Sequence, residues 1–275
     1  MPSGISVSTG IFLRNHLLVA GDMAGLPKHR HPVEGGYQRG EETRARIIAA
    51  ALKLFGERGF EGASTRDIAT SAGVNAPALQ YYFDSKEGVY IACVEHIVSR
   101  VWQYTSDAVT QGEQALAANA GDETLIDAYC AIQERKADLM FTSQDADDWR
   151  LFVARQQAGG GPPAAFRLFC GVSDRMSEVA AGIIGRLLGR PVNDDETLIR
   201  ATTLSGQLAA FQIAKRSVLM RLNWDSVDGE RLALLKRVTR EQTIALLRSM
   251  IAIRDSARGG ASNKSASSDK KPRRK

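Results

Sequence analysis

Helical periodicity of apolar residues runs through the chain from about residue 42 to residue 254 and constrains the fold more than any other feature. Apolar side chains recur there every three or four residues, as one face of a helix requires, and no segment shows the apolar–polar alternation of a strand. The sequence therefore predicts an all-α protein of about nine helices, separated at clusters of Gly, Pro and Asn. The expected helices cover residues 42–58, two short segments within 64–83, and then 85–109, 122–143, 146–157, 163–189, 194–222 and 227–254.

The two ends of the chain lack this periodicity. Residues 1–38 are broken by Gly and Pro and are expected to form a mobile arm, with Met1 and Met23 both standing as candidate starts. Residues 255–275 are polar, basic and low in complexity, which predicts a disordered tail. A basic tail favours either extra phosphate contacts or simple solubility. Between the ends we expect two domains, over residues 39–86 and 87–254.

Composition and motifs exclude several classes of protein. The chain is 44% hydrophobic and 24% charged, as is typical of soluble globular proteins, and no apolar run reaches the length of a membrane span. A cytoplasmic, nucleoid-associated protein without a membrane partner is therefore expected. Cys93, Cys130 and Cys170 are too far apart for a metal motif, so neither metal nor cofactor is predicted. The absence of P-loop, GxGxxG and HExxH motifs argues against an enzyme.

Residues 64–83 carry the signals of two short helices joined by a tight turn. Ser64 and Asp67 have the spacing of a capping box, which opens the first helix. Gly73 can take the positive φ of a turn. Asn75 is a good N-cap, and Pro77 falls in the first turn of the second helix, where its missing N–H costs nothing. Together these signals predict a helix-turn-helix.

The second helix of this pair has an inward and an outward side. Leu79 and Phe83 are four residues apart and face the small core, whereas Gln80 is left exposed. A glutamine can form two hydrogen bonds with adenine, and a tyrosine hydroxyl such as those of Tyr81 and Tyr82 can reach a phosphate. This helix is therefore expected to enter the DNA major groove. Asp84 or Ser85 is expected to cap the following helix.

The stretch STRDIATSAGVNAPALQYYFDSKEGVY, residues 64–90, resembles the DNA-binding signature of the TetR family of bacterial transcriptional regulators. The resemblance implies that Thr65, Tyr81, Tyr82 and Lys86 contact phosphates, and that Arg66, Asn75, Ala76, Pro77 and Gln80 face the groove. Two departures matter: Asn75-Ala76-Pro77 replaces the family's common Ser-Lys-Gly turn, and Tyr82 replaces a frequent His. The base preference of relatives therefore does not transfer to this chain.

The later segments YIACVEHIV, VARQQ and LAAFQIAKRSVLMRLNW resemble the CecR-like branch of that family, whose members repress genes including those of drug-efflux transporters. The resemblance implies a cavity for a small, largely apolar effector, although the same aromatic residues also fit an ordinary core. Arg155, Glu134 and His96 are candidates to orient a polar group of the effector. The expected lining residues are Trp102, Tyr129, Phe141, Trp149, Phe152, Phe166 and Phe169.

The last two long helices are expected to pair two protomers, because palindromic operators present half-sites about one helical turn apart. The alternative is that these helices pack only within one protomer. The expected dimer residues are Leu204, Gly206, Leu208, Phe211, Leu235, Val238 and Leu247. The whole pattern predicts a homodimeric, ligand-responsive repressor of double-stranded DNA operators, with residues 85–109 as a connecting lever and efflux or drug-response genes as targets. The alternative is a TetR-like protein controlled by a protein partner without a small ligand.

Overall fold

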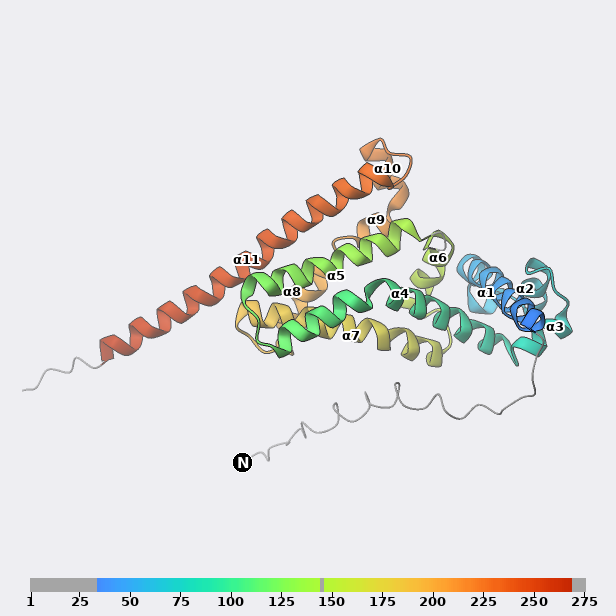
Figure 1. The fold of residues 1–275 in the computed structure, drawn as a ribbon, viewed down its shortest axis with the longest axis horizontal. Helices are drawn as coiled ribbons and strands as arrows, with labels where there is room; N and C mark the ends of the chain where they lie inside the picture. The colour runs from blue at the N-terminus through green and yellow to red at the C-terminus, as the bar shows by residue number, and fades with distance from the viewer. Residues whose placement is uncertain (1–33, 144–145, 269–275) are drawn as a thin grey trace, which may run out of the picture. The chain divides into compact units, whose positions relative to one another are not determined.

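The computed structural model describes residues 34–143 and 146–268 (Figure 1). Within these residues there are eleven helices and no strand, which confirms the predicted all-α class. The predicted arm, up to residue 33, and the end of the predicted tail, residues 269–275, lie outside the described residues. The helices are α1 (Glu34–Gly62), α2 (Thr65–Ser71), α3 (Ala76–Tyr82), α4 (Lys86–Ala117), α5 (Asp122–Thr142), α6 (Ala146–Gln157), α7 (Pro163–Leu188), α8 (Asp195–Ser205), α9 (Ala209–Ile213), α10 (Lys215–Leu222) and α11 (Gly229–Ser268).

Local capping fixes the short helices α2 and α3, as the sequence predicts. The Asp67 N–H donates to Ser64 Oγ at 3.1 Å, and the Ser64 N–H donates to Asp67 Oδ2 at 3.3 Å, which completes the capping box. The Ser64 hydroxyl, which donates to Asp67 Oδ2 at 2.7 Å, and the Ser64 N–H lower the pKa of the Asp67 carboxyl. Asn75 Oδ1 accepts from the third residue of α3 at 2.8 Å, and Ser85 rather than Asp84 caps α4. Gly59, at φ 76°, interrupts α1 where the sequence places its end.

The helical body is built around α4, α5 and α7, which pack against one another (Figure 1). Helix α11 packs on α5 and α7, and α8 packs on α7. Close approach of α4 and α7 depends on Gly112, because a Cβ at that position would lie 2.7 Å from Val179 Cγ1. Among the described residues no helix is both long and apolar enough to cross a bilayer.

The core around the helix-turn-helix continues into α6. Leu79 and Phe83 are buried with the apolar face of α1, and the same cluster includes Trp149 and Phe152 of α6. Helix α4 contributes to this cluster with its first half and to the cluster of the helical body with its second half. The apolar core therefore extends past residue 86, where the sequence suggests a domain boundary.

The predicted helix 194–222 is wrong, because the structure divides this stretch into α8, α9 and α10. The cause lies on α5, which the local sequence does not reveal. Gln133 Nε2 donates to the Leu204 carbonyl at 2.7 Å, and Lys136 Nζ donates to the Ser205 carbonyl at 3.0 Å. These bonds provide partners for the last carbonyls of α8. The helix can therefore end at Gly206 without leaving buried carbonyls unsatisfied. The extra helices account for the difference from the predicted number.

Three helices are longer than predicted. Helix α1 begins at Glu34 rather than at about residue 42, so residues 34–38 of the predicted arm are helical. Helix α4 runs to Ala117 rather than to about residue 109, and α11 runs to Ser268 rather than to about residue 254. At the predicted end of α11, Arg254 forms a double hydrogen bond with the Asp122 carboxylate, at 2.9 and 2.8 Å. This ion pair ties α11 to the first turn of α5 and lowers the pKa of Asp122.

Candidate nucleic-acid interface and internal cavity

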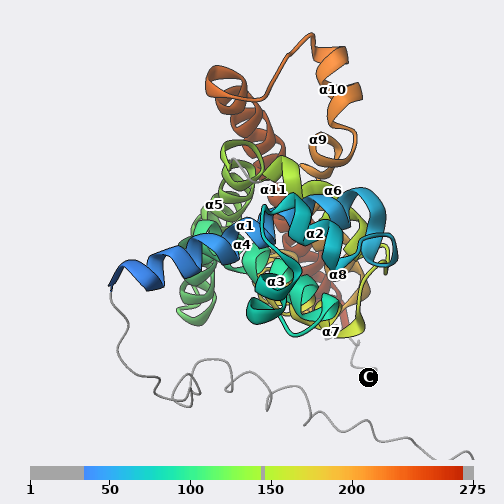
Figure 2. The ribbon, with the colours of Figure 1, turned by 90° about the vertical axis from the view of Figure 1, so that its right-hand side faces the viewer.

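The outward side of α3 is a small, mostly uncharged surface. Helix α3 packs against α2 (Figure 2). Ala76, Pro77, Gln80 and Tyr81 are exposed, and Tyr81 is 84% exposed, the highest value among the large apolar and aromatic side chains that the structure describes. Tyr82 is half-buried against the core and meets the Tyr81 ring edge-to-face, with centroids 5.3 Å apart. One tyrosine thus supports the other, which leaves the outer hydroxyl available for a phosphate.

The other predicted DNA-contacting residues surround this surface. Arg66 is exposed on α2, and Thr65 is partly buried at the first position of that helix. Lys86 begins α4, and its Nζ lies 4.4 Å from the centroid of the Phe60 ring. Asn75 is exposed, but its side-chain oxygen is engaged in capping α3, so only its amide NH₂ is left to donate to a base.

Two cations that the sequence reasoning missed lie beside the turn. The Arg44 guanidinium carbon is 5.4 Å from the centroid of the Phe83 ring. Arg46 Nη1 is 4.0 Å from where a Cβ of Gly73 would stand, so its guanidinium lies next to the turn between α2 and α3. Both arginines stand about one turn before the buried apolar residues of α1, and this position could have predicted that they lie near the helix-turn-helix. These arginines offer phosphate contacts that the uncharged α3 lacks.

The helical body contains a partly open cavity of about 560 Å³, lined by α4 to α10. Four of the seven predicted ligand residues line it: Tyr129, Phe141, Trp149 and Phe169. Additional lining residues include Ile97 and Val101 of α4, Met140 of α5, Met176 of α7 and Phe211. The walls are therefore mainly aromatic and aliphatic, as is usual for sites that bind small apolar molecules.

The other three predicted ligand residues do not line this cavity. Phe152 is buried on the opposite side of α6, where its ring centroid lies 4.6 Å from that of Tyr90. Trp102 packs under Arg175, whose guanidinium carbon is 4.6 Å from the ring centroid. Phe166 is 43% exposed. The candidate polar residues are also absent from the lining: Arg155 binds α1, Glu134 pairs with Arg240 at 2.9 Å, and His96 lies beside Trp149.

One corner of the cavity is polar, and no pattern in the sequence indicates it. Tyr129, Gln133 and Lys136 follow one face of α5, and all three reach the end of α8. The Tyr129 hydroxyl lies 3.4 Å from Ser205 Oγ. Burial raises the pKa of Tyr129 to about 12 and lowers the pKa of Lys136 below its ordinary value. Desolvation disfavours the charged form in both cases.

Two faces of helix α6 contact different parts of the molecule. One face lines the cavity and includes Trp149, Val153 and Gln157, which are spaced four residues apart. On the other face, Arg155 Nε donates to the Gly56 carbonyl at 2.7 Å, and Arg155 Nη2 donates to the Glu57 carbonyl at 3.0 Å. Helix α6 alone therefore lies between this wall of the cavity and the carbonyls of Gly56 and Glu57 on α1.

That second face is also joined to α4. The Tyr90 hydroxyl donates to Gln156 Oε1 at 2.7 Å in the interior. Burial raises the pKa of this tyrosine to about 12, so it stays a neutral donor. Helix α6 is therefore held to both α1 and α4 by hydrogen bonds.

Most of the predicted dimer residues are buried within the protomer. Leu204, Leu208, Leu235 and Leu247 belong to its own apolar clusters, Phe211 lines the cavity, and Gly206 and Val238 are exposed. Val238 is one of several exposed apolar side chains on these helices, and the others were not predicted: Leu198 and Ile199 on α8, and Leu234, Leu246 and Ile253 on α11.

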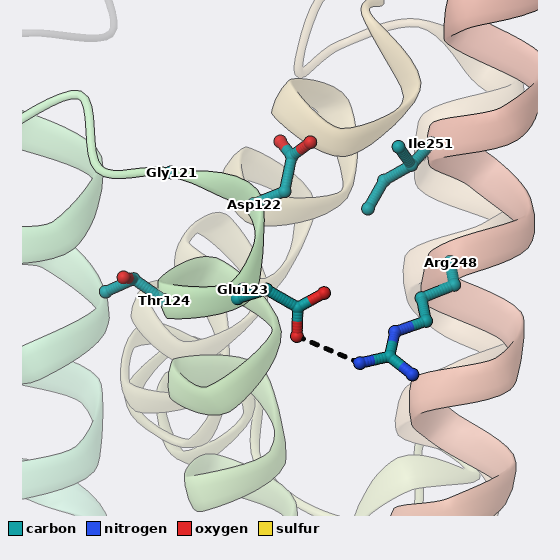
Figure 3. A pocket seen from close by; sticks show the side chains of 6 residues that line it. All are labelled: Gly121, Asp122, Glu123, Thr124, Arg248 and Ile251. Carbon is teal, nitrogen blue, oxygen red and sulfur yellow. Dashed lines mark hydrogen bonds and ion pairs between the residues drawn. The ribbon is translucent and has the colours of Figure 1, made fainter.

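A second depression lies at the start of α5, opposite α11 (Figure 3). It measures about 470 Å³ and is lined by Gly121, Asp122, Glu123, Thr124, Arg248 and Ile251. Arg248 Nη2 is 3.1 Å from Glu123 Oε2, and Asp122 is paired with Arg254. Its charged groups already have partners in the protein, which distinguishes it from the mainly apolar cavity between α4 and α10.

A capped helix-turn-helix joined to a helical body with an internal cavity defines a DNA-binding transcriptional regulator. Residues 47–93 match the model of the bacterial regulatory proteins of the tetR family, and residues 125–250 match that of the C-terminal domain of the HTH-type transcriptional dual regulator CecR. The chain is 30% identical over 203 residues to CecR from Shigella flexneri, across 72% of this chain and 88% of the relative. The chain therefore belongs to the TetR family of bacterial regulators, in its CecR-like branch.

Two further comparisons are shorter or more distant. The HTH-type transcriptional repressor NicS from Pseudomonas putida is 42% identical over 60 residues, or 22% of this chain and 28% of that protein. The crystal structure of the TetR family regulator PfmR from Thermus thermophilus is similar with a TM-score of 0.47 and 21% identity, over 74% of this chain and 97% of PfmR.

Proposed function

We propose that this transcriptional regulator is a ligand-responsive repressor that binds a palindromic operator as a homodimer and is released by a small, largely apolar molecule. The observation that carries the proposal is the cavity of about 560 Å³ with aromatic and methionine walls. Its size lies within the range of small-molecule sites, roughly 300–1,000 Å³. Efflux or drug-response genes are suitable targets, because their products act on molecules of this apolar kind.

On the DNA side, we propose that α3 enters the major groove with Ala76, Pro77 and Gln80 toward the bases. The exposure of these side chains supports this orientation. Arg66 and the Asn75 amide NH₂ are placed to assist at the base edges. Phosphate contacts are assigned to Thr65, Tyr81, Tyr82 and Lys86, with Arg44 and Arg46 as additions from the structure.

For the homodimer, we propose that the exposed faces of α8 and α11 meet their copies. The buried leucines predicted from the sequence support these helices from inside the protomer. Val238 and Gly206 remain at the surface of the expected interface, joined by Ile199, Leu246 and Ile253. An exposed apolar surface of this kind is typical of a protein–protein contact.

The coupling we propose runs through α6 and α4. Both helices line the cavity and both are part of the core beneath the helix-turn-helix. An occupant that fits one arrangement of α6 better than another shifts the balance between them, by typically 1–3 kcal/mol of coupling free energy. The Arg155 hydrogen bonds then carry the shift to the end of α1.

The first test is selection of genomic DNA fragments by the purified full chain at about 150 mM salt, at which nonspecific phosphate binding is much reduced. A two-fold symmetric motif is expected from the wild type, and Tyr81→Ala serves as a folded variant with a missing phosphate contact. Absence of enrichment from a folded dimer would overturn the proposal.

The second test follows from the selected fragment. Apolar compounds are screened for release of the protein from that DNA, with a reporter gene recording the direction of regulation. Release together with derepression supports the proposal. A protein that responds to no compound yet is released by a cellular protein would instead establish control by a protein partner.

A further inference from the structure

We propose that the effector is an organic acid, with an apolar body held by the aromatic walls of the cavity and an anionic head paired with Lys136. This inference rests on the proposed function, because it takes the cavity as the effector site. It adds the chemical class of the ligand and the residue that selects it.

The geometry around Lys136 leaves room for an anion. Lys136 lines the cavity on α5, and its Nζ donates one hydrogen bond, to the Ser205 carbonyl at 3.0 Å. An ammonium has three N–H donors, so donors are left over. No carboxylate of the described residues forms an ion pair with Lys136. A partly buried cation with one neutral partner is costly unless a further charge compensates it.

The charges of the cavity wall also favour an anionic ligand. Among its described lining residues, three are cationic and none is acidic: Lys136, Arg150 and Lys215. Arg150 Nε is buried without a hydrogen-bond partner. Each unpaired buried donor carries a desolvation cost that an anionic ligand removes.

Neighbouring groups complete a site for a carboxylate or sulfonate. Gln133 and Tyr129 lie one and two turns from Lys136 on the same face of α5, and Ser205 faces them from α8. Burial lowers the pKa of the Lys136 ammonium. A bound anion opposes that shift, because an opposite charge favours the protonated form.

The remaining walls suit an aromatic or aliphatic body. Trp149, Phe169 and Phe141 surround the space together with Met140 and Met176. Methionine side chains adapt their shape and make favourable contacts with aromatic rings. The ligand class is therefore an amphipathic acid rather than a uniformly apolar molecule.

Anion binding at Lys136 also reaches the proposed dimer surface. The same ammonium holds the last carbonyl of α8, and α8 exposes Leu198 and Ile199 on its outer side. An anion bound to the remaining donors draws the Lys136 ammonium toward the cavity and away from the Ser205 carbonyl. Release of that carbonyl frees the end of α8, and thereby changes how two protomers meet.

The experiment uses two fluorescent probes with the same body. 8-Anilinonaphthalene-1-sulfonate carries an anionic head, and N-phenyl-1-naphthylamine lacks it. Dissociation constants are measured by fluorescence titration of the full chain at pH 7. The variants are Lys136→Met, which keeps the length of the side chain without its charge, Lys136→Arg, and Lys53→Met as a matched control on the exposed side of α1.

Lys136→Met is expected to weaken binding of the anionic probe by about tenfold or more, as loss of a hydrogen bond to a charged group implies, and to leave binding of the neutral probe within about twofold. Lys136→Arg keeps most of the preference for the anion, and Lys53→Met changes the binding of neither probe. Thermal unfolding of each variant verifies that it is folded.

Equal weakening of both probes, or no weakening of either, would overturn the inference and show that Lys136 only holds α8. Binding of neither probe to the wild type would also overturn it. These failures are distinguishable from failure of the proposed function, which is read from DNA selection and from release of the DNA by compounds.

Discussion

The helix-turn-helix and the cavity region are held together in opposite ways. In α2 and α3 the polar groups at the helix starts are satisfied within three residues, and the apolar side chains fill a closed core. Around the cavity, the polar contacts join residues about 70 positions apart, and a volume of about 560 Å³ is left unfilled. The first region is therefore fixed by local contacts, and the second depends on contacts between distant residues around an unfilled volume.

Helix α6 belongs to both regions, which makes it the place to test the comparison. Phe152 stands on its face toward the DNA-binding core, and Trp149 is the neighbouring aromatic residue that also lines the cavity. If the two regions differ as described, substitutions on the two faces of α6 must have different consequences.

The largest effect is expected from Phe152→Ala, which breaks the filled core. Removal of a buried phenylalanine lowers the free energy of unfolding by about 3–5 kcal/mol. Phe166→Ala is the matched control, since that ring is 43% exposed and its loss should cost below about 1 kcal/mol. Urea unfolding measures both. Similar losses in the two variants would contradict the placement of Phe152.

Gln80→Ala tests whether the exposed side of α3 recognises a base. Loss of a double hydrogen bond to a base costs about 1–3 kcal/mol of discrimination at one operator position. Selection of DNA with the variant is expected to relax the motif at that position and its symmetry mate only. A motif identical to that of the wild type would remove Gln80 from the recognition surface.

Arg155→Met is expected to weaken the coupling between the cavity region and the helix-turn-helix. Its two hydrogen bonds to α1 are partly exposed, so the loss of stability should be about 1.5 kcal/mol. The more informative result is a reduced release of DNA by an effector that still binds with unchanged affinity. Binding and release are measured separately by fluorescence titration and DNA retention. Full release from the variant would place the coupling in α4 instead.

The smallest expected effect is on the pH dependence of the free energy of unfolding, to which Lys136 beside the cavity contributes. Burial lowers the pKa of Lys136 in the folded protein below its ordinary value of 10.5. Between the lowered pKa and 10.5 the unfolded chain binds more protons, so the free energy of unfolding rises with pH there. The raised pKa values of the Cys93 and Cys130 thiols contribute a slope of the opposite sign in this range, so the contribution of Lys136 is read as a difference between variants. Urea unfolding at about pH 8, 9 and 10 should show a more positive slope in the wild type and in Lys53→Met than in Lys136→Met. An equal slope in Lys136→Met would assign it to other groups.

The sequence predicted the helix-turn-helix because its determinants are local. Ser64 and Asp67 cap each other, and Asn75 caps its own helix, so spacing alone identifies them. The break after α8 was missed because Gln133 and Lys136 cause it from another helix. Periodicity placed Trp149 and Phe152 on one amphipathic helix, but it did not show that only Trp149 also lines the cavity.

The glycine at position 56 sets a practical limit on recombining regulators of this type. A Cβ there would stand 3.1 Å from the Phe152 backbone nitrogen and 3.2 Å from Leu151 Cβ, and the carbonyls of Gly56 and Glu57 receive the Arg155 guanidinium. A DNA-reading segment grafted from another regulator must therefore bring a residue without a side chain at this seam. Residues 44–83 together with α6 are the unit most easily transplanted, because the Arg155 donor and its carbonyl acceptors on α1 then arrive already matched.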